Sequence, residues 1–303
     1  MVTFFMRTMM YLFLLLVFLF VVVGGWCWKI QKDILATPPV FSEYGTELYF
    51  CVKNVLNFSS LYKQDEKSQK TTLINTHFGN ISNLLLGVNE NLYYDCRKRF
   101  DSSIWKLDPV KNEKTKVYDI SDTFFTFGSV LFDGTILLSY LRWKDTTDIF
   151  VGYTSGESRL AILTLDGLVL SDVFESEFHL AYPKKMPGTN NVLFKNYFIS
   201  DDPREFKIYN LKTKEERYLP IEVHVDQWCY DDKNNRIYFQ GKGFVWEYDM
   251  ASEKLRKLFA FKEEIDFLVK HPVEMKFLVK FSNNPKTMFY VDADGVVSKF
   301  FSI

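Results

Sequence analysis

The sequence is poor in cysteine and carries almost no net charge. Four cysteines in 303 residues are too few for a disulfide scaffold. The 37 basic and 38 acidic side chains give a net charge of −1, so no overall positive field would attract nucleic acid. Glycine and proline are sparse, with 14 and 9 residues, while aromatic residues make up 17% of the chain. This composition excludes a disordered chain and indicates a domain with a substantial core.

Common catalytic and nucleotide-binding motifs are missing as well. The chain has no G-x-G-x-x-G, no phosphate-binding loop with its lysine, no H-E-x-x-H and no G-x-S-x-G. The small basic cluster at residues 97–99 is typical of a solvated turn rather than of a nucleic-acid patch. We therefore expect no cofactor, no metal site and no nucleic-acid partner.

A stretch of 21 residues without charge runs from Thr8 to Trp28. As a helix it would rise roughly 31 Å, which matches the hydrocarbon core of a bilayer. Trp26 and Trp28 stand at its end, where aromatic rings favour the headgroup region. The pattern predicts a transmembrane signal anchor at residues 1–29, followed by a linker at residues 30–40.

Three other interpretations of this segment stay open. It could be a cleavable signal peptide with a cleavage site at Val22-x-Gly24, or a lipoprotein signal with attachment through Cys27. It could also be a buried helix of a soluble domain. The positive charges on its two sides are nearly balanced, so orientation is weakly specified. We favour a single-pass membrane protein whose body lies on the exported side, either periplasmic or extracellular.

The rest of the chain repeats one short pattern. Each copy is an apolar strand that ends at Asp or Asn, followed by a polar turn and a second strand. The six Asp or Asn residues, which we call the turn residues, are spaced 43, 58, 44, 39 and 43 positions apart. Such a side chain can accept hydrogen bonds from the backbone of the turn. The turn residues are Asp65, Asp108, Asp166, Asn210, Asp249 and Asp292.

Two further apolar runs precede the turn residue in a unit, as Phe124–Phe132 and Ile136–Tyr140 do in the third. Four strands in about 43 residues are typical of a β-propeller blade. One such sheet cannot bury both faces, whereas a ring of sheets buries each face against a neighbour. The sequence thus predicts an all-β, six-bladed β-propeller of four-stranded antiparallel blades at residues 41–303, preceded by one transmembrane helix. The alternatives, a pair of β-sandwiches or a β-solenoid, fit the regular spacing less well.

The strands before the turn residues share a motif, seen in Ile104-Trp-Lys-Leu-Asp108 and Val245-Trp-Glu-Tyr-Asp249. Glycine-containing turns follow at Asp166-Gly167 and Asp292-Ala-Asp294-Gly295. Units of this kind resemble those of six-bladed, TolB-like propellers, and the resemblance covers roughly residues 38–303. It implies the architecture only, because propellers host binding, scaffolding and catalysis alike.

Three histidines recur at similar places in the units. His77, His179 and His224 follow their turn residues by 12, 13 and 14 positions, and Glu264 occupies the corresponding place in the last unit. The spacing predicts that these residues lie where innermost strands begin, near one mouth of the central channel. Imidazole and carboxylate groups there could bind a ligand. His179, His224 and Glu264 are candidate binding residues, and the alternative is ordinary hydrogen-bonded side chains at strand ends.

The third unit is the longest, and its excess falls within Leu141–Ser158. This segment joins the second and third strands and should project from one face. Arg142, Trp143, Phe150 and Tyr153 give it the aromatic and charged groups that recognition loops use. We treat these four as candidate binding residues; the alternative is an extra hairpin without a binding role.

These observations favour a membrane-anchored propeller that acts as a binding or interaction module for a protein or glycan partner. The competing hypothesis is a propeller enzyme, such as a metal-dependent hydrolase or lyase, with its site at the mouth of the channel. A third is a structural component of an envelope complex. No residue pattern indicates a reaction mechanism, so we favour binding over catalysis.

Overall fold

The structure is a computed structural model of the chain. It describes residues 34–54, 57–87, 90–98, 101–120, 123–130, 135–143, 156–165, 169–176, 179–197 and 204–302. The predicted transmembrane helix at residues 1–29 lies outside these residues. Within the described part of the chain, no helix is long and apolar enough to cross a membrane.

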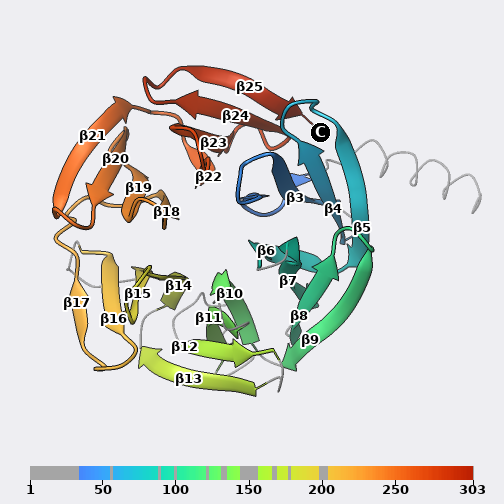
Figure 1. The fold of residues 1–303 in the computed structure, drawn as a ribbon, viewed down its shortest axis with the longest axis horizontal. Helices are drawn as coiled ribbons and strands as arrows, with labels where there is room; N and C mark the ends of the chain where they lie inside the picture. Colours follow the sequence, from blue (N-terminus) through green and yellow to red (C-terminus); the bar gives the residue numbers. More distant parts are fainter. Residues whose placement is uncertain are drawn as a thin grey trace, which may run out of the picture.

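The described strands form six antiparallel sheets arranged as blades around a centre (Figure 1). In each sheet the strands follow one another in chain order from the centre to the rim. The predicted six-bladed propeller with four-stranded antiparallel blades is confirmed. The sandwich and solenoid alternatives are excluded, because the sheets form neither two facing layers nor a linear stack.

The strands fall into blades as follows. The first blade holds β1 (Ile34–Leu35), β2 (Val40–Phe41), β3 (Glu47–Lys53), β4 (Phe58–Asp65) and β5 (Thr71–Phe78). The second holds β6 (Asn80–Leu86), β7 (Leu92–Lys98), β8 (Asp101–Asp108) and β9 (Glu113–Ile120), and the third holds β10 (Thr123–Val130), β11 (Thr135–Trp143), β12 (Gly156–Thr164) and β13 (Val169–Ser176). The fourth holds β14 (His179–Lys185), β15 (Asn191–Tyr197), β16 (Phe206–Asn210) and β17 (Glu216–Tyr218), and the fifth holds β18 (Gln227–Asp231), β19 (Arg236–Gly241), β20 (Phe244–Asp249) and β21 (Lys254–Ala260). The sixth holds β22 (Ile265–Lys270), β23 (Lys276–Phe281), β24 (Thr287–Asp292) and β25 (Val297–Ser302).

The first blade has a divided inner strand. Both β1 and β2 pair with β3, at Leu35↔Val52 and Phe41↔Leu48, and the residues between them include two prolines. Proline cannot donate to a ladder, so the strand is interrupted there. The part of the predicted linker that the structure describes therefore belongs to the first blade, because only this preceding segment supplies that blade with an inner strand.

Five of the six turn residues end third strands and organise the hairpins that follow, as the sequence predicted, while Asp166 lies outside the described residues. Asp108 Oδ1 accepts hydrogen bonds from the amides of Val110 and Lys111, both at 2.9 Å. Asn210 Oδ1 accepts two bonds in the same way, also at 2.9 Å. The bonds from the turn backbone hold the pKa of the Asp108 carboxyl below its ordinary value. Corresponding bonds form at Asp65, Asp249 and Asp292.

The core lies between the blades rather than inside any one of them. For example, Leu137 of the third blade packs in one buried cluster with Leu180 and Phe194 of the fourth. Every face of a blade is apolar for this reason, which explains the high aromatic content of the chain.

In several blades, a buried side chain on the second strand donates a hydrogen bond to the next blade. Ser139 Oγ donates to the carbonyl oxygen of Leu180 at 2.8 Å, and Gln240 Nε2 donates to that of Glu263 at 2.6 Å. Lys195 Nζ reaches the carbonyl oxygen of Val225 in the same manner. Each acceptor lies where the next blade's inner strand begins. We call these contacts the inter-blade ties.

The ring closes between the sixth and first blades, a contact that we call the seam. Within the described residues the two blades share no sheet, so side chains hold the seam together. Leu48 and Phe50 pack there against Phe267, Leu278 and Met288. The aliphatic and aromatic packing is supplemented by a hydrogen bond from the Leu35 amide to the Pro285 carbonyl oxygen at 3.3 Å.

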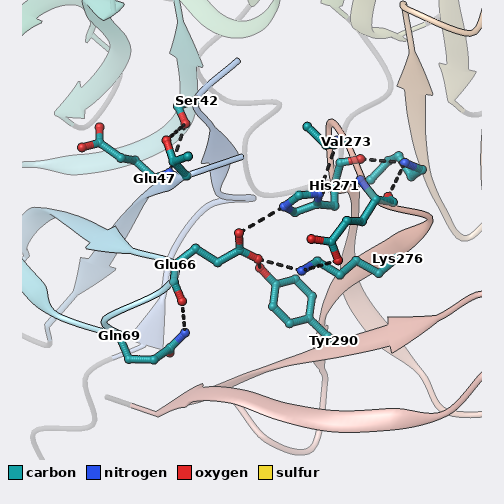
Figure 2. Close-up of polar contacts among 11 residues, drawn as sticks. Ser42, Glu47, Glu66, Gln69, His271, Val273, Lys276 and Tyr290 are labelled. Atoms are coloured by element: carbon teal, nitrogen blue, oxygen red, sulfur yellow. Dashed lines mark hydrogen bonds and ion pairs between the residues drawn. The ribbon is translucent and has the colours of Figure 1, made fainter. Parts of the chain in front are cut away.

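Glu66 crosses the seam at the ends of the blades and binds three residues of the sixth blade (Figure 2). Its carboxylate accepts hydrogen bonds from Lys276 Nζ at 2.7 Å and Tyr290 OH at 2.8 Å, and lies 3.4 Å from His271 Nε2. Burial raises the pKa of Glu66, but the bonds from Lys276 and Tyr290 outweigh it and leave the pKa below 4.5. A half-buried, ionised carboxylate therefore joins the two blades.

Candidate functional site

A cavity of about 560 Å³ lies between the inner strands. It is lined by residues of β6, β14, β18 and β22 and by residues 36–41 of the first blade. Inner strands of this kind surround the centre of the ring (Figure 1). The cavity is therefore the central channel of the propeller, and its volume falls in the range of small-ligand pockets.

Five aromatic residues line this cavity, from four blades. They are Phe41, Tyr182, Trp228, Tyr230 and Phe267. Trp228 also packs edge-on against Phe206, with ring centroids 5.0 Å apart, so its indole is held in place. Aromatic rings in a concave site offer flat apolar faces to a ligand.

Bulges in two inner strands place polar residues in the cavity wall. In β6 the ladder skips Ser82 and Asn83, since Ile81 pairs with Cys96 and Leu84 with Tyr94. The skipped residues line the cavity. In β14 the bulge includes Tyr182, which has a φ of 50°. Bulges re-aim side chains next to functional sites, and here they bring hydroxyl and amide groups to the centre of the ring.

Two lysines lie at the C-terminal ends of the inner strands. Burial lowers the pKa of Lys184, and the carboxylate of Asp232 opposes this effect. Burial also lowers the pKa of Lys270, whose Nζ donates to the carbonyl oxygens of His271 and Glu274 at 2.6 and 2.7 Å. Nearby acidic residues offset these positive charges, so the cavity is not a strongly charged anion site.

Asp95 lies directly behind the cavity wall and is completely buried. Its Oδ1 accepts hydrogen bonds from the backbone amides of Ser82 at 3.0 Å and Asn83 at 2.6 Å. Its Oδ2 is buried without a hydrogen-bond partner. Burial raises the pKa of this carboxyl to about 7, and hydrogen bonds from the two amides and from the Asn83 side chain only partly oppose the shift.

A second polar cluster lies at the N-terminal ends of the inner strands. His224 precedes β18, and its Nδ1 lies 2.5 Å from Oε1 of Glu205. The other oxygen of Glu205 is 2.9 Å from Lys195 Nζ. His224 Nε2 lies 3.7 Å from Asp226 Oδ1, and the imidazole is 75% exposed. A half-buried carboxylate therefore orients an exposed imidazole at one end of the ring.

The structure describes the other residues that were predicted to lie at the channel mouth less completely. His179 is the first residue of β14, as predicted, but its side chain is not among those described. Glu264 directly precedes β22 and is exposed. His77 differs from its prediction, because it lies in outer strand β5, where Tyr94 OH is 3.3 Å from its Nδ1. A binding role for His179, His224 and Glu264 stays a prediction.

The long loop of the third unit is largely outside the described part of the chain. Arg142 and Trp143 end β11, where their backbones pair with Glu157 and Gly156, and nothing is described of their side chains. Phe150 and Tyr153 lie outside the described residues. The loop therefore stays a predicted recognition element.

Several site residues escaped the sequence analysis. Glu205 lies 19 positions before its partner His224, a separation that no local motif covers. Asp95 gave a weak signal, because a charged residue interrupts the apolar strand Leu92–Cys96. Among the described residues, no group of three or more His, Cys, Asp or Glu side chains could hold a metal ion.

Comparisons with known proteins agree with this architecture. No family model and no curated protein matches the chain. An oligogalacturonate lyase in complex with manganese is 15% identical, has a TM-score of 0.62, and aligns over 90% of this chain and 78% of its own. A second oligogalacturonate lyase, from Vibrio parahaemolyticus, is 12% identical, with a TM-score of 0.61 and the same coverage.

TolB from Acinetobacter baumannii is 10% identical and has a TM-score of 0.65. The match covers 84% of this chain but only 63% of TolB, so this chain spans less than two thirds of that protein. The chain resembles TolB-like six-bladed propellers. At these identities the likeness concerns the fold, and function must be argued from the site.

Proposed function

We propose that this protein is a binding module that takes a short oligosaccharide segment into its central cavity. The observation that carries the proposal is the cavity itself, which combines about 560 Å³ with five aromatic rings. Small-ligand sites are concave and mostly apolar, with a few fixed polar groups. A closed ring of six blades supplies such a site without any moving part.

The chemistry of the lining favours a sugar over other small ligands. Aromatic faces such as those of Trp228 and Tyr182 pack against the apolar faces of sugar rings. Ser82, Asn83 and Gln227 supply hydroxyl and amide groups that both donate and accept hydrogen bonds. Two of the similar structures are named oligogalacturonate lyases, which supports an oligosaccharide as the ligand class.

Calorimetric titration of the full chain in mild detergent tests this proposal. The probes are trigalacturonate, which is carboxylated, and cellotriose, which is neutral. We expect at least one to bind, and Trp228→Leu to weaken that binding about tenfold or more. Trp105→Leu is the matched control, because Trp105 is also partly buried but does not line the cavity. Equal loss in both variants, or no binding of either sugar, would refute the proposal.

A protein partner is the other outcome to examine. In that case the long loop with Arg142, Trp143, Phe150 and Tyr153 would form the contact, and the sugar titrations would be flat. Stoichiometric co-purification of a second protein in mild detergent, lost when residues 144–155 are deleted, would identify this case. The same co-purification would distinguish a structural component of a larger assembly.

One observation favours a second candidate function, an enzyme acting by proton transfer. Glu205 contacts His224 through Nδ1, and Nε2 belongs to an exposed imidazole ring, an arrangement found in general acid–base sites. Release of new sugar ends from trigalacturonate, abolished in both His224→Gln and Glu205→Gln, would support catalysis. Binding without turnover in the unchanged protein would support the binding module alone.

We further propose that the N-terminal segment at residues 1–29 anchors the propeller to a membrane, with the body on the exported side. The charge-free stretch from Thr8 to Trp28 supports this arrangement. Protease treatment of intact cells, with and without permeabilising the outer layer, tests sidedness. Digestion of the propeller only after full lysis would refute export of the body.

A further inference from the structure

In three blades the donor of the inter-blade tie occupies the same register position of the second strand. In the fourth, fifth and sixth blades, the donor lies four residues after the residue that pairs with the turn residue. For the fourth blade, Asn191 pairs with Asn210, and Lys195 is the donor. The same rule gives Gln240 in the fifth blade and Lys280 in the sixth.

Asp95 occupies this register position in the second blade. Leu92 pairs with Leu107, which places Asn91 opposite the turn residue Asp108. Four residues later comes Asp95. Its neighbour on the same face, Tyr93, packs with residues of the third blade, so the carboxyl also lies on the face toward the next blade.

An ionised aspartate cannot act as a tie, because a carboxylate has acceptors only. Oδ1 of Asp95 already accepts from the two amides of the β6 bulge, whereas Oδ2 is buried with no partner. A proton on Oδ2 turns this oxygen into a donor on the face where the other blades place one. A fully buried, unpaired charge is avoided at the same time.

Among the described residues, no cation is one of the groups that shift the pKa of Asp95. The facing strands β6 and β10 have the sequences NISNLLL and TFFTFGSV, without an ionisable side chain. In β8, Ile104 lies opposite Asp95. Lys106 pairs with Tyr93, two positions from Asp95 along β7. Asp101 pairs with Lys98, near the other end of the two strands.

Two neighbouring groups outside those strands are acidic rather than basic. A negative charge on Asp95 raises the pKa of Cys51 and of Tyr182, so neither group favours that charge. Tyr182 also lines the cavity, which puts the titrating carboxyl within electrostatic reach of a ligand there.

We propose that Asp95 gains and loses a proton in the neutral pH range and, in its protonated form, positions the β6 bulge that presents Ser82 and Asn83 to the cavity. Asp95 is thus a positioning residue and does not touch the ligand. Its effect on ligand affinity rests on the proposed function of the cavity. In the neutral form, Oδ1 holds the bulge and the protonated Oδ2 links Asp95 to the next blade. When the proton is lost, only the hydrogen bonds to Oδ1 remain.

The first experiment measures the proton directly and needs no ligand. The full chain, labelled with carbon-13 at aspartate carboxyl groups, is titrated by NMR, and Asp95→Asn identifies the signal of Asp95. We expect a titration midpoint near pH 7. A midpoint below about 5, within the ordinary range of aspartate, overturns the proposal.

The second experiment follows the affinity for trigalacturonate and cellotriose from pH 5.5 to pH 8.5. We expect affinity to fall above neutral pH by no more than about tenfold per pH unit, because one proton is involved. Asp95→Asn, which keeps a donor and cannot ionise, should bind with a flat pH profile. Asp108→Asn is the matched control on an outer hairpin and should keep the profile of the unchanged protein.

The two experiments separate the two ideas. If the affinity for sugar does not change as Asp95 titrates, the positioning role is refuted and the proposed binding module is retained. A midpoint near 7 without any sugar binding refutes the binding module and still shows the buried proton. If Asp95→Asn fails to fold, Asp95→Ser replaces it, because serine is the donor that the third blade uses at Ser139.

Discussion

Lys280 of the last blade donates a hydrogen bond from Nζ to the carbonyl oxygen of Leu35 in β1, at 3.0 Å. The fourth and fifth blades make the same kind of inter-blade tie to the blade that follows each of them. In the sixth blade this tie reaches the first blade and so closes the ring. The lysine is buried, and Asp266 Oδ2 lies 2.7 Å from the same nitrogen. One register position thus serves both as a joint between blades and as the closure of the propeller.

Removing the closing tie should destabilise the ring. In Lys280→Met the Leu35 carbonyl and the Asp266 carboxylate lose their buried donor, so we expect a loss of about 2 kcal/mol in the free energy of unfolding. Urea unfolding measures it. Lys233→Met is the control, because this exposed lysine also donates to a carbonyl, that of Glu43 at 3.1 Å. A similar loss in both variants would contradict a special role for the buried tie.

Gly45 should be sensitive to substitution for a steric reason. It has a φ of 71°, and a Cβ there would lie 2.6 Å from the ring of His271. Gly45→Ala is expected to cost about 3 kcal/mol of stability, from backbone strain and the clash together. Gly188→Ala isolates the backbone part, since Gly188 has a φ of 65° with nothing within 4 Å of the added Cβ. Thermal unfolding of the two variants gives the comparison, and equal melting temperatures would rule out the clash.

The seam should weaken in mild acid. Nδ1 of His271 accepts hydrogen bonds from the amides of Val273 and Glu274, at 3.3 and 3.0 Å, so the folded state requires it unprotonated. Burial and then the charge of Lys276 lower the pKa of His271 below 6.5. The unfolded chain therefore binds the proton first as pH falls below about 6.5, and stability drops by at most about 1.4 kcal/mol per pH unit.

Stability curves from pH 7.5 to 5.5 measure this dependence. His271→Asn keeps an acceptor at the same place and removes the ionisable group, so its curve should be flatter than that of the unchanged protein. Glu66 adds a separate loss at lower pH: its folded pKa lies below 4.5, so its stabilising effect disappears as pH falls through that lower value. An equally steep curve in His271→Asn would assign the effect to other groups.

The turn residues should tolerate only exchange between Asn and Asp. Asn210→Leu removes the acceptor of two amide hydrogen bonds and is expected to cost about 1 kcal/mol. Asn210→Asp keeps the accepting oxygen and should stay within about 0.5 kcal/mol of the unchanged protein. Denaturant unfolding distinguishes them. Comparable losses would show that the apolar strand, and not the side-chain cap, fixes the hairpin.

Much of the fold could be predicted because its signals are local. The apolar runs, the turn residues and their spacing all lie within single units, and the hydrogen bonds at Asp108 and Asn210 join residues two or three positions apart. The divided inner strand of the first blade was missed, since two short runs around Pro38 and Pro39 read as a linker. His77 was misplaced because spacing from a turn residue does not fix which strand follows.

The candidate site was less predictable because its contacts are long-range. Glu205 reaches His224 across 19 positions, and Glu66 reaches Lys276 across 210. The sequence by itself determined the repeat, the strand order and the caps of the hairpins, since these depend on neighbours along the chain. Only the tertiary structure decided which side chains meet at the centre and at the seam, because ring closure brings the first and last blades together and buries Asp95 behind the cavity wall.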